Sequence, residues 1–177
     1  MTKTSVAVFG SSQAPRDSTH YLLARDVGAA LARRGASVRC GGYDGVMAGV
    51  AEGVRAEGGK VVGCTLAWYA GSRRPSSQLS EIREAEDLSA RIENLLLGTR
   101  GAIVLPGGVG TFNELFWVWT LLTHDREDGP DSLVLLGDHW EELLDLLGRR
   151  FEFGPELRAL VRVASNPEEA ATIAWGE

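Results

Sequence analysis

Short apolar runs alternate with longer segments of helical periodicity along most of this chain. The apolar runs predict strands at residues 5–9, 37–40, 60–65, 101–105 and 132–136. Apolar side chains at three- and four-residue spacing predict helices at 18–34, 45–57, 87–99, 111–123, 139–149 and 167–174. The stretch 66–79, rich in glycine, proline and serine, is expected to be irregular. This alternation favours one doubly wound α/β domain over residues 1–177, with a mostly parallel sheet and helices on both faces.

The predicted helix 111–123 is apolar around nearly its whole circumference. Its large apolar side chains are Phe112, Leu115, Phe116, Trp117, Val118, Trp119, Leu121 and Leu122. A helix with this pattern has to be buried on more than one side. It is either central to the monomer or its outer face meets a second subunit. We expect the second arrangement, a homodimer with two-fold symmetry.

A glycine-rich turn connects the predicted strand 101–105 to this helix and reads Pro106-Gly-Gly-Val-Gly-Thr-Phe-Asn-Glu114. A strand, a glycine turn and a helix in this order place backbone N–H groups and a helix N-terminus against an anion, usually a phosphate. Glycines leave no side chain between the backbone and that ligand. We therefore predict a phosphorylated small molecule as the ligand, bound at Pro106, Gly107, Gly108, Val109, Gly110 and Thr111.

The same turn excludes two common nucleotide-binding motifs. No lysine follows its glycines, so it is not the P-loop of a triphosphatase. It is also not the G-x-G-x-x-G sequence that opens the first βαβ unit of many dinucleotide-binding domains.

Two further turns of small residues follow predicted strands, at the edge where α/β proteins gather their ligands. The first contains Gly10, Ser11 and Ser12, and the second contains Gly41, Gly42 and Asp44. We assign all six residues to the ligand site. For Asp44 two roles stay open, a hydrogen bond to a ribose hydroxyl or the N-cap of the helix that begins near residue 45.

Arg91 and Glu114 are the candidate catalytic residues. Glu114 lies one turn into its helix beside the glycine turn, although Thr111-x-x-Glu114 also fits a capping box. Arg91 lies in the first turn of a helix that runs antiparallel to the strand it precedes, so it returns to the ligand edge. There it either clamps a phosphate or a base edge, or faces solvent. Arg73 and Arg74 fit either a lid over the anion site or a solvated loop.

Composition narrows the class of protein further. The formal net charge is −6, which disfavours binding to nucleic acid or to an anionic membrane. No apolar stretch is long enough to span a bilayer, so a cytoplasmic location is expected. Cys40 and Cys64 are predicted to be small buried core residues. The three histidines show no metal-ligand spacing, and neither a metal nor a cofactor is expected.

The motif from Pro106 to Glu114, with Arg91 fifteen residues before the proline, resembles the LOG family of Rossmann-like proteins, formerly described as lysine decarboxylases. The turns at 10–12 and 41–47 also resemble the first two loops of that family, and the likeness covers about residues 5–150. The resemblance implies a phosphoribohydrolase, which splits a nucleoside 5′-monophosphate into free base and ribose 5-phosphate. It also implies catalytic roles for Arg91 and Glu114.

Three positions depart from the usual pattern of that family. Tyr43 follows Gly41-Gly42 where a third glycine is usual, Ile92 stands in place of a lysine, and Asn113 in place of a glutamate. This form of the loops is closer to the branch that includes molybdenum-cofactor carrier proteins, which bind a phosphorylated pterin. The alternative function is therefore a non-catalytic carrier of a phosphorylated nucleotide-like or molybdopterin ligand. A pyridoxal phosphate decarboxylase is excluded, because Lys3 and Lys60 are the only lysines and neither is predicted at the ligand edge.

Overall fold

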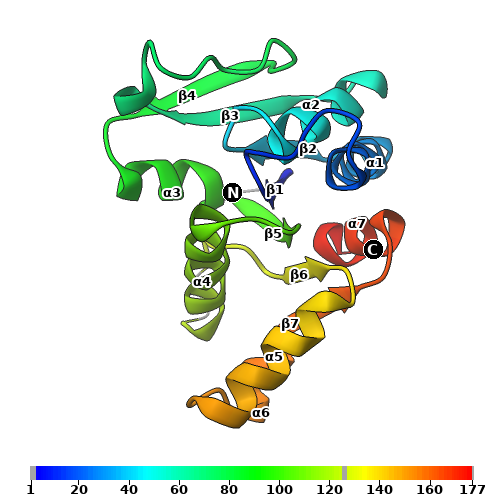
Figure 1. The fold of residues 1–177 in the computed structure, drawn as a ribbon, viewed down its shortest axis with the longest axis vertical. Helices are drawn as coiled ribbons and strands as arrows, with labels where there is room; N and C mark the ends of the chain where they lie inside the picture. Colours follow the sequence, from blue (N-terminus) through cyan, green and yellow to red (C-terminus); the bar gives the residue numbers. More distant parts are fainter. Residues whose placement is uncertain (1–2, 125–126, 177) are drawn as a thin grey trace.

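The computed structural model describes residues 3–124 and 127–176, which form one Rossmann-like α/β domain (Figure 1). The strands are β1 (Ser5–Phe9), β2 (Ser37–Cys40), β3 (Val61–Leu66), β4 (Glu81–Ala85), β5 (Thr99–Val104), β6 (Leu133–Leu136) and β7 (Val161–Ala164). The helices are α1 (Thr19–Arg33), α2 (Val46–Ala56), α3 (Leu88–Leu96), α4 (Val109–Thr123), α5 (His139–Arg150), α6 (Pro155–Ala159) and α7 (Pro167–Trp175). A 3₁₀ turn, η1, covers Ala67–Tyr69.

All seven strands of the sheet are parallel, in the order β4-β3-β2-β1-β5-β6-β7. The chain therefore winds outward from β1 to β4, returns to the other side of β1 as β5, and winds outward again to β7. The doubly wound fold expected from the alternating pattern is confirmed. Winding changes direction between β1 and β5, and at such a point the loops after the two strands separate and leave a crevice for a ligand.

Helices cover both faces of the sheet and make two hydrophobic cores. Helices α1, α2 and α7 pack on one face, and α3, α4 and α5 pack on the other (Figure 1). Strands covered on both sides read as continuous apolar runs, which is why the central strands are visible in the sequence. Cys40 belongs to the first core and Cys64 to the second, and burial raises their thiol pKa values to about 12 and about 11. Both are buried free cysteines, as expected.

The strands at the two edges of the sheet, β4 and β7, and the short helix α6 were not predicted. β4 has the sequence Glu-Ile-Arg-Glu-Ala, in which three of five residues are charged, and its Ile82 is half exposed. Arg162 of β7 is likewise exposed. Edge strands are covered less completely than central ones, so they lack the continuous apolar run that identified the others.

Helix α4 is buried on one side only within the monomer. Leu115, Val118 and Trp119 lie in the second core, whereas 36% of Phe116 and 43% of Trp117 are exposed. The helix begins at Val109, two residues earlier than predicted. In the part of the chain that the structure describes, no helix combines the length and the apolar character needed to cross a membrane.

Candidate active site

The pocket with the candidate chemistry lies in the crevice between β1 and β5. The loops after these strands are tied together, since the Ser11 N–H donates to the Pro106 carbonyl at 3.0 Å. The pocket has a volume of about 430 Å³, within the usual range for small-molecule sites. Its walls come from loops after β1, β2 and β3 and from the starts of α3 and α4. The lining residues are Gly10, Ser11, Ser12, Gln13, Tyr43, Met47, Leu66, Tyr69, Arg73, Leu88, Arg91, Gly108, Val109, Gly110, Thr111 and Glu114.

The N-terminus of α4 forms one end of the pocket. Gly108 is extended (φ −95°, ψ −159°), and the Phe112 N–H makes the first helical hydrogen bond, to the Gly108 carbonyl at 3.1 Å. The N–H groups of Val109, Gly110 and Thr111 precede that bond, as the first amides of any helix do. These three residues line the pocket. Their amides and the positive end of the helix dipole suit this end of the pocket to an anion.

Glu114 does not cap this helix. The N-cap is Gly108, with no side-chain capping bond, so Thr111 and Glu114 both lie inside the helix. The capping-box interpretation of Thr111-x-x-Glu114 is wrong. Its physical reason is the early start of α4, because a capping box needs Thr111 to remain outside the helix. Glu114 is instead turned toward α3, where its carboxylate meets Arg91.

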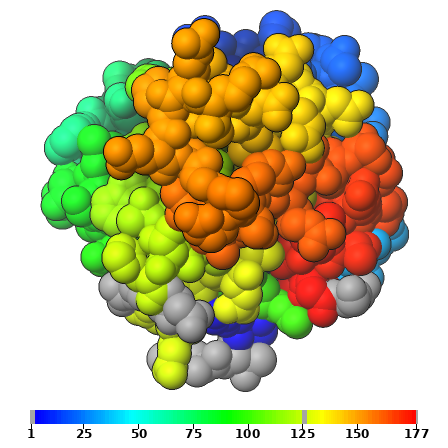
Figure 2. All heavy atoms as spheres, turned by 90° about the horizontal axis from the view of Figure 1, so that it is seen from below, coloured from blue at the N-terminus to red at the C-terminus, as the bar shows by residue number. Residues whose placement is uncertain are grey.

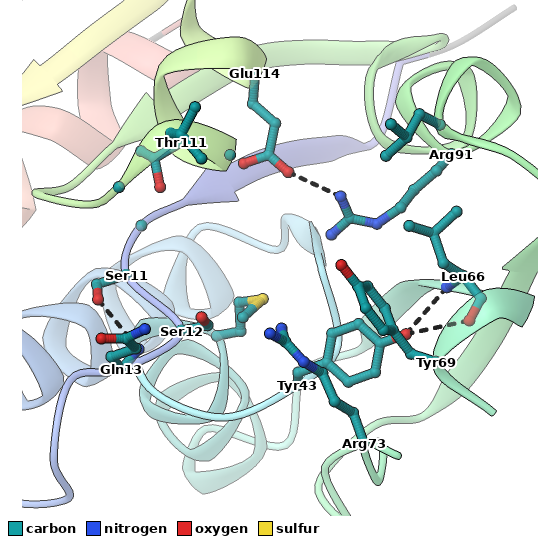
Figure 3. A pocket seen from close by; sticks show the side chains of 16 residues that line it. Ser11, Ser12, Gln13, Tyr43, Leu66, Tyr69, Arg73, Arg91, Thr111 and Glu114 are labelled. Atoms are coloured by element: carbon teal, nitrogen blue, oxygen red, sulfur yellow. Dashed lines mark hydrogen bonds and ion pairs between the residues drawn. The ribbon is translucent and has the colours of Figure 1, made fainter. Parts of the chain in front are cut away.

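Arg91 and Glu114 form an ion pair inside the pocket (Figure 3). Arg91 lies in the first turn of α3, whose N-cap Asp87 accepts a hydrogen bond from the Ala90 N–H at 2.9 Å. Its Nη1 donates to Glu114 Oε1 at 3.1 Å, and its Nε donates to the Cys64 carbonyl at 2.8 Å. The guanidinium is thus fixed between the end of β3 and the second turn of α4.

Burial of the pair changes the acidity of Glu114. The Glu114 residue is only 8% exposed, and burial raises its pKa to about 7, although the neighbouring Arg91 charge opposes the rise. A carboxyl with this pKa exchanges its proton readily at neutral pH. A buried acid with a shifted pKa and a fixed charged partner in a cleft is typical of functional sites.

Several glycines assigned to the site support it from behind rather than lining it. A Cβ on Gly41 would clash with Nη2 of Arg91 and lie 2.5 Å from the Met47 sulfur. A Cβ on Gly107 would clash with the Thr111 hydroxyl and lie 2.9 Å from the Ser11 nitrogen. Gly42 and Pro106 are also absent from the pocket wall. Gly41 and Gly107 keep space for neighbouring groups, the Arg91 guanidinium above all.

Asp44 does not lie where either of its proposed roles would place it. The side chain is exposed and is not part of the pocket wall. The N-cap of α2 is Gly45, with no side-chain capping bond, so the capping role is wrong. Gly45 has φ +70°, and a Cβ there would clash with the Ser11 carbonyl. A glycine is required at this close approach, and the residue before it, Asp44, faces solvent.

Sequence reasoning missed most of one side of the pocket, which is formed by Tyr43, Tyr69 and Arg73. Of these three, only Arg73 was a candidate, as part of either a lid or a solvated loop. Tyr43 was noted only as a departure from a glycine pattern. Tyr69 and Arg73 belong to the segment between β3 and β4, and Arg74 beside them is exposed and outside the wall. The one usable signal was the aromatic residue Tyr43 in a glycine-rich turn.

These features define a class of protein: a Rossmann-like domain with a glycine-rich helix N-terminus and a buried Arg–Glu pair at its topological switch point. The family model described as "Possible lysine decarboxylase" matches residues 47–173. The chain belongs to this family, which is the LOG family.

Relatives agree with this assignment, and a solved structure shares the fold. The cytokinin riboside 5′-monophosphate phosphoribohydrolase of Mycobacterium tuberculosis is 36% identical over 140 residues, covering 77% of this chain and 71% of the relative. The phosphoribohydrolase LOG3 of Arabidopsis thaliana is 27% identical over 168 residues, covering 93% and 78%. The molybdenum cofactor carrier protein of Chlamydomonas reinhardtii has the same fold, with a TM-score of 0.69 at 21% identity over 96% of this chain and 94% of that one.

Proposed function

We propose that this protein is a nucleoside 5′-monophosphate phosphoribohydrolase, with Arg91 and Glu114 as its catalytic residues. The observation that carries the proposal is the buried Arg91–Glu114 pair, which faces the same pocket as the anion-binding start of α4. Two relatives, 36% and 27% identical to this chain over the aligned residues, are named cytokinin riboside 5′-monophosphate phosphoribohydrolases.

The reaction breaks the bond between C1′ of the ribose and a ring nitrogen of the base. The bonding electron pair leaves with the base, which takes up a proton. A water oxygen adds to C1′, and that water loses a proton. Positive charge builds on the ribose as the bond breaks, and the Glu114 carboxylate stabilises that charge and accepts the proton of the water. Arg91 holds the carboxylate in place and keeps part of it ionised.

Binding of the phosphate positions the sugar for this step. We assign the 5′-phosphate to the amides at the start of α4, with Ser11 and Ser12 on the facing loop. Binding energy gained at the phosphate, away from the bond that breaks, is then available to hold C1′ beside Glu114. The free ligand is a cytoplasmic metabolite in this proposal, and the two buried free cysteines are compatible with a reducing compartment.

The test is incubation of the purified protein with AMP, GMP and IMP, followed by chromatography for free base and an assay for ribose 5-phosphate. Equal amounts of the two products support the proposal. Tight binding of a monophosphate without either product supports the alternative, a carrier of a phosphorylated nucleotide-like or molybdopterin ligand. Tyr43, Ile92 and Asn113, which depart from the usual hydrolase pattern, are the observations that favour the alternative.

The word decarboxylase in the family description does not suit this pocket. A pyridoxal phosphate enzyme needs a lysine for its Schiff base. Neither of the two lysines lines the pocket: Lys60 pairs with Glu81, and Lys3 pairs with Asp131.

The rate of base release is expected to rise with pH through the pKa of Glu114. Since the ionised carboxylate is the active form, kcat/KM should increase about tenfold per pH unit below pH 7 and level off above it. Arg91→Met removes the cation that lowers this pKa, so the midpoint should move to higher pH in the variant. Profiles of kcat/KM from pH 5 to 9 measure both effects. A rate that falls between pH 6 and 8 would instead assign the protonated acid to the reaction.

We also propose that the protein is a homodimer formed through α4. Figure 2 shows this helix at the surface beside α5 and α6. Its exposed Trp117, next to Phe116, is the apolar surface that a second copy would cover. Sedimentation should give twice the mass of the chain, and Trp117→Glu should give the monomer mass. Trp68→Glu alters an exposed tryptophan outside α4 and should leave the dimer intact. A monomeric wild-type protein at micromolar concentration contradicts the proposal.

A further inference from the structure

One side of the pocket carries chemistry that the hydrolytic step does not use. It consists of Tyr43, Tyr69 and Arg73, which together we name the tyrosine–arginine wall. The Tyr43 hydroxyl accepts a hydrogen bond from the Leu66 N–H at 3.0 Å, at the end of β3. The Tyr69 ring packs edge-on against Tyr43, with centroids 5.8 Å apart and an interplanar angle of 90°. The two rings are therefore anchored to the sheet.

Arg73 is held against these rings although its side chain is exposed. Its guanidinium carbon lies 4.6 Å from the centroid of the Tyr69 ring and 5.9 Å from that of Tyr43. The N–H groups of Ser72 and Arg73 both donate to the Tyr69 carbonyl at 3.0 Å, which fixes the turn that carries the side chain. Stacking uses the face of the guanidinium and leaves its N–H edges free for a ligand.

The charges around the pocket leave Arg73 available. Three charged side chains line it, and two of them, Arg91 and Glu114, pair with each other. Within residues 3–124 and 127–176, no carboxylate pairs with Arg73. Figure 3 shows Arg73 and the tyrosines across the pocket from Thr111 and Glu114. With the phosphate at the start of α4, this wall faces the opposite end of the ligand, which is the base.

We infer that the tyrosine–arginine wall recognises the base, and that the substrates are monophosphates of 6-oxopurines such as GMP and IMP. The inference rests on the proposed phosphoribohydrolase function. A guanidinium only donates hydrogen bonds, and O6 and N7 of a 6-oxopurine are adjacent acceptors that it contacts together. Adenine has an amino donor in place of O6, so two donors would meet. An N6-isopentenyl group would also place an apolar chain against the charge.

An oxidised pterin presents the same edge, because its 4-oxo group and N5 are adjacent acceptors on a fused ring. The chemistry recognised is therefore an oxo-substituted fused heterocycle joined to a phosphate. Nucleotides and pterin phosphates are the two sources of such a ligand. We assign the nucleotide because the Arg91–Glu114 pair offers chemistry for an N-glycosidic bond, and the experiment separates the two sources.

The first measurement compares kcat/KM for GMP, IMP, AMP and N6-isopentenyl-AMP. Wild-type protein should favour the two 6-oxopurines over AMP by about tenfold or more, as a paired guanidinium contact to O6 and N7 does. Arg73→Gln should lower kcat/KM for GMP and IMP at least to the level of AMP. It should not lower kcat/KM for AMP, because a glutamine amide can pair with N6 and N7 of adenine. Arg74→Gln, its exposed neighbour, is the matched control.

Preference of the wild-type protein for AMP or N6-isopentenyl-AMP overturns the inference. An equal loss of kcat/KM for all four substrates in Arg73→Gln also overturns it. If no nucleotide is hydrolysed, the proposed function fails, and calorimetric Kd values for GMP, AMP and neopterin monophosphate decide the inference separately. Tighter binding of GMP than AMP, lost in Arg73→Gln, supports it. Tightest binding of the pterin would overturn the nucleotide assignment, and equal binding of GMP and AMP would overturn recognition of the base.

Discussion

Replacing Glu114 by glutamine is expected to lower kcat for base release by about 10²–10⁴-fold, the usual contribution of a positioned general base. Glutamine keeps the shape of the side chain, and its amide oxygen still accepts the hydrogen bond from Arg91 Nη1. It cannot carry the negative charge that stabilises the ribose or accept a proton from water. Nucleotide Kd should therefore stay nearly unchanged, and calorimetry together with base-release assays measures the two effects separately.

The matched control for this variant is Glu52→Gln. Glu52 is also hydrogen-bonded, to Tyr21 and Arg16, but it lies outside the pocket. Its replacement should leave kcat unchanged. Near-normal kcat in Glu114→Gln would reduce Glu114 to a structural role and remove the main support for hydrolysis. Loss of binding together with kcat would mean that the substitution had disturbed the pocket itself.

The same variant should change how stability depends on pH. Because the folded-state pKa of Glu114 is about 7, raised from an ordinary 4.5, the folded protein binds more protons than the unfolded chain between these values. The free energy of unfolding therefore falls as pH rises from 4.5 to 7. Glu114→Gln lacks this group, so its Tm should exceed that of wild type at pH 8 and the gain should shrink toward pH 4.5. Such a gain is typical of a site where function costs stability.

How much of the site the sequence predicts depends on whether backbone or side chains do the binding. The glycine turn offers N–H groups and open space, so its spacing alone predicts an end of the pocket suited to an anion. Arg91 followed from the direction in which a helix returns to its strand. Most of the tyrosine–arginine wall could not be found this way. Arg73 was a candidate only as part of a lid or a solvated loop, and Tyr69 reaches the pocket through the path of the chain between β3 and β4.

Local patterns failed where a distant element decided the outcome. The sequence Thr111-x-x-Glu114 fits both a capping box and a site residue on the helix. The start of α4 after Gly108 and the ion pair with Arg91 on α3 decide for the second. Buried central strands were visible as apolar runs, whereas β4 and β7 were missed because their partly exposed positions break that run. The close approach of α1 and α2 was also invisible, since glycine within a predicted helix has several explanations.

That close approach gives the largest expected effect on stability. Gly49 and Gly53 lie four residues apart, on one face of α2, and Gly28 lies on α1. A Cβ on Gly53 would clash with the Arg25 carbonyl oxygen and lie 2.8 Å from its carbon and 2.9 Å from the Ala29 nitrogen. All three are backbone atoms, so none of them can move aside as a side chain would. The helices themselves would have to separate.

Gly53→Ala is therefore expected to lower the free energy of unfolding by about 3 kcal/mol, the upper part of the usual cost of overpacking a core. For a chain of this length this corresponds to a fall in Tm of about 10 °C. Gly148→Ala is the matched control, because its Cβ would lie 3.7 Å from the nearest atom, the Phe153 carbonyl oxygen. With space available, alanine should stabilise α5 by about 0.5–1 kcal/mol. Calorimetric scans of both variants test the pair. Equal changes in Tm for the two variants would show that helix propensity, rather than the contact between α1 and α2, governs both positions.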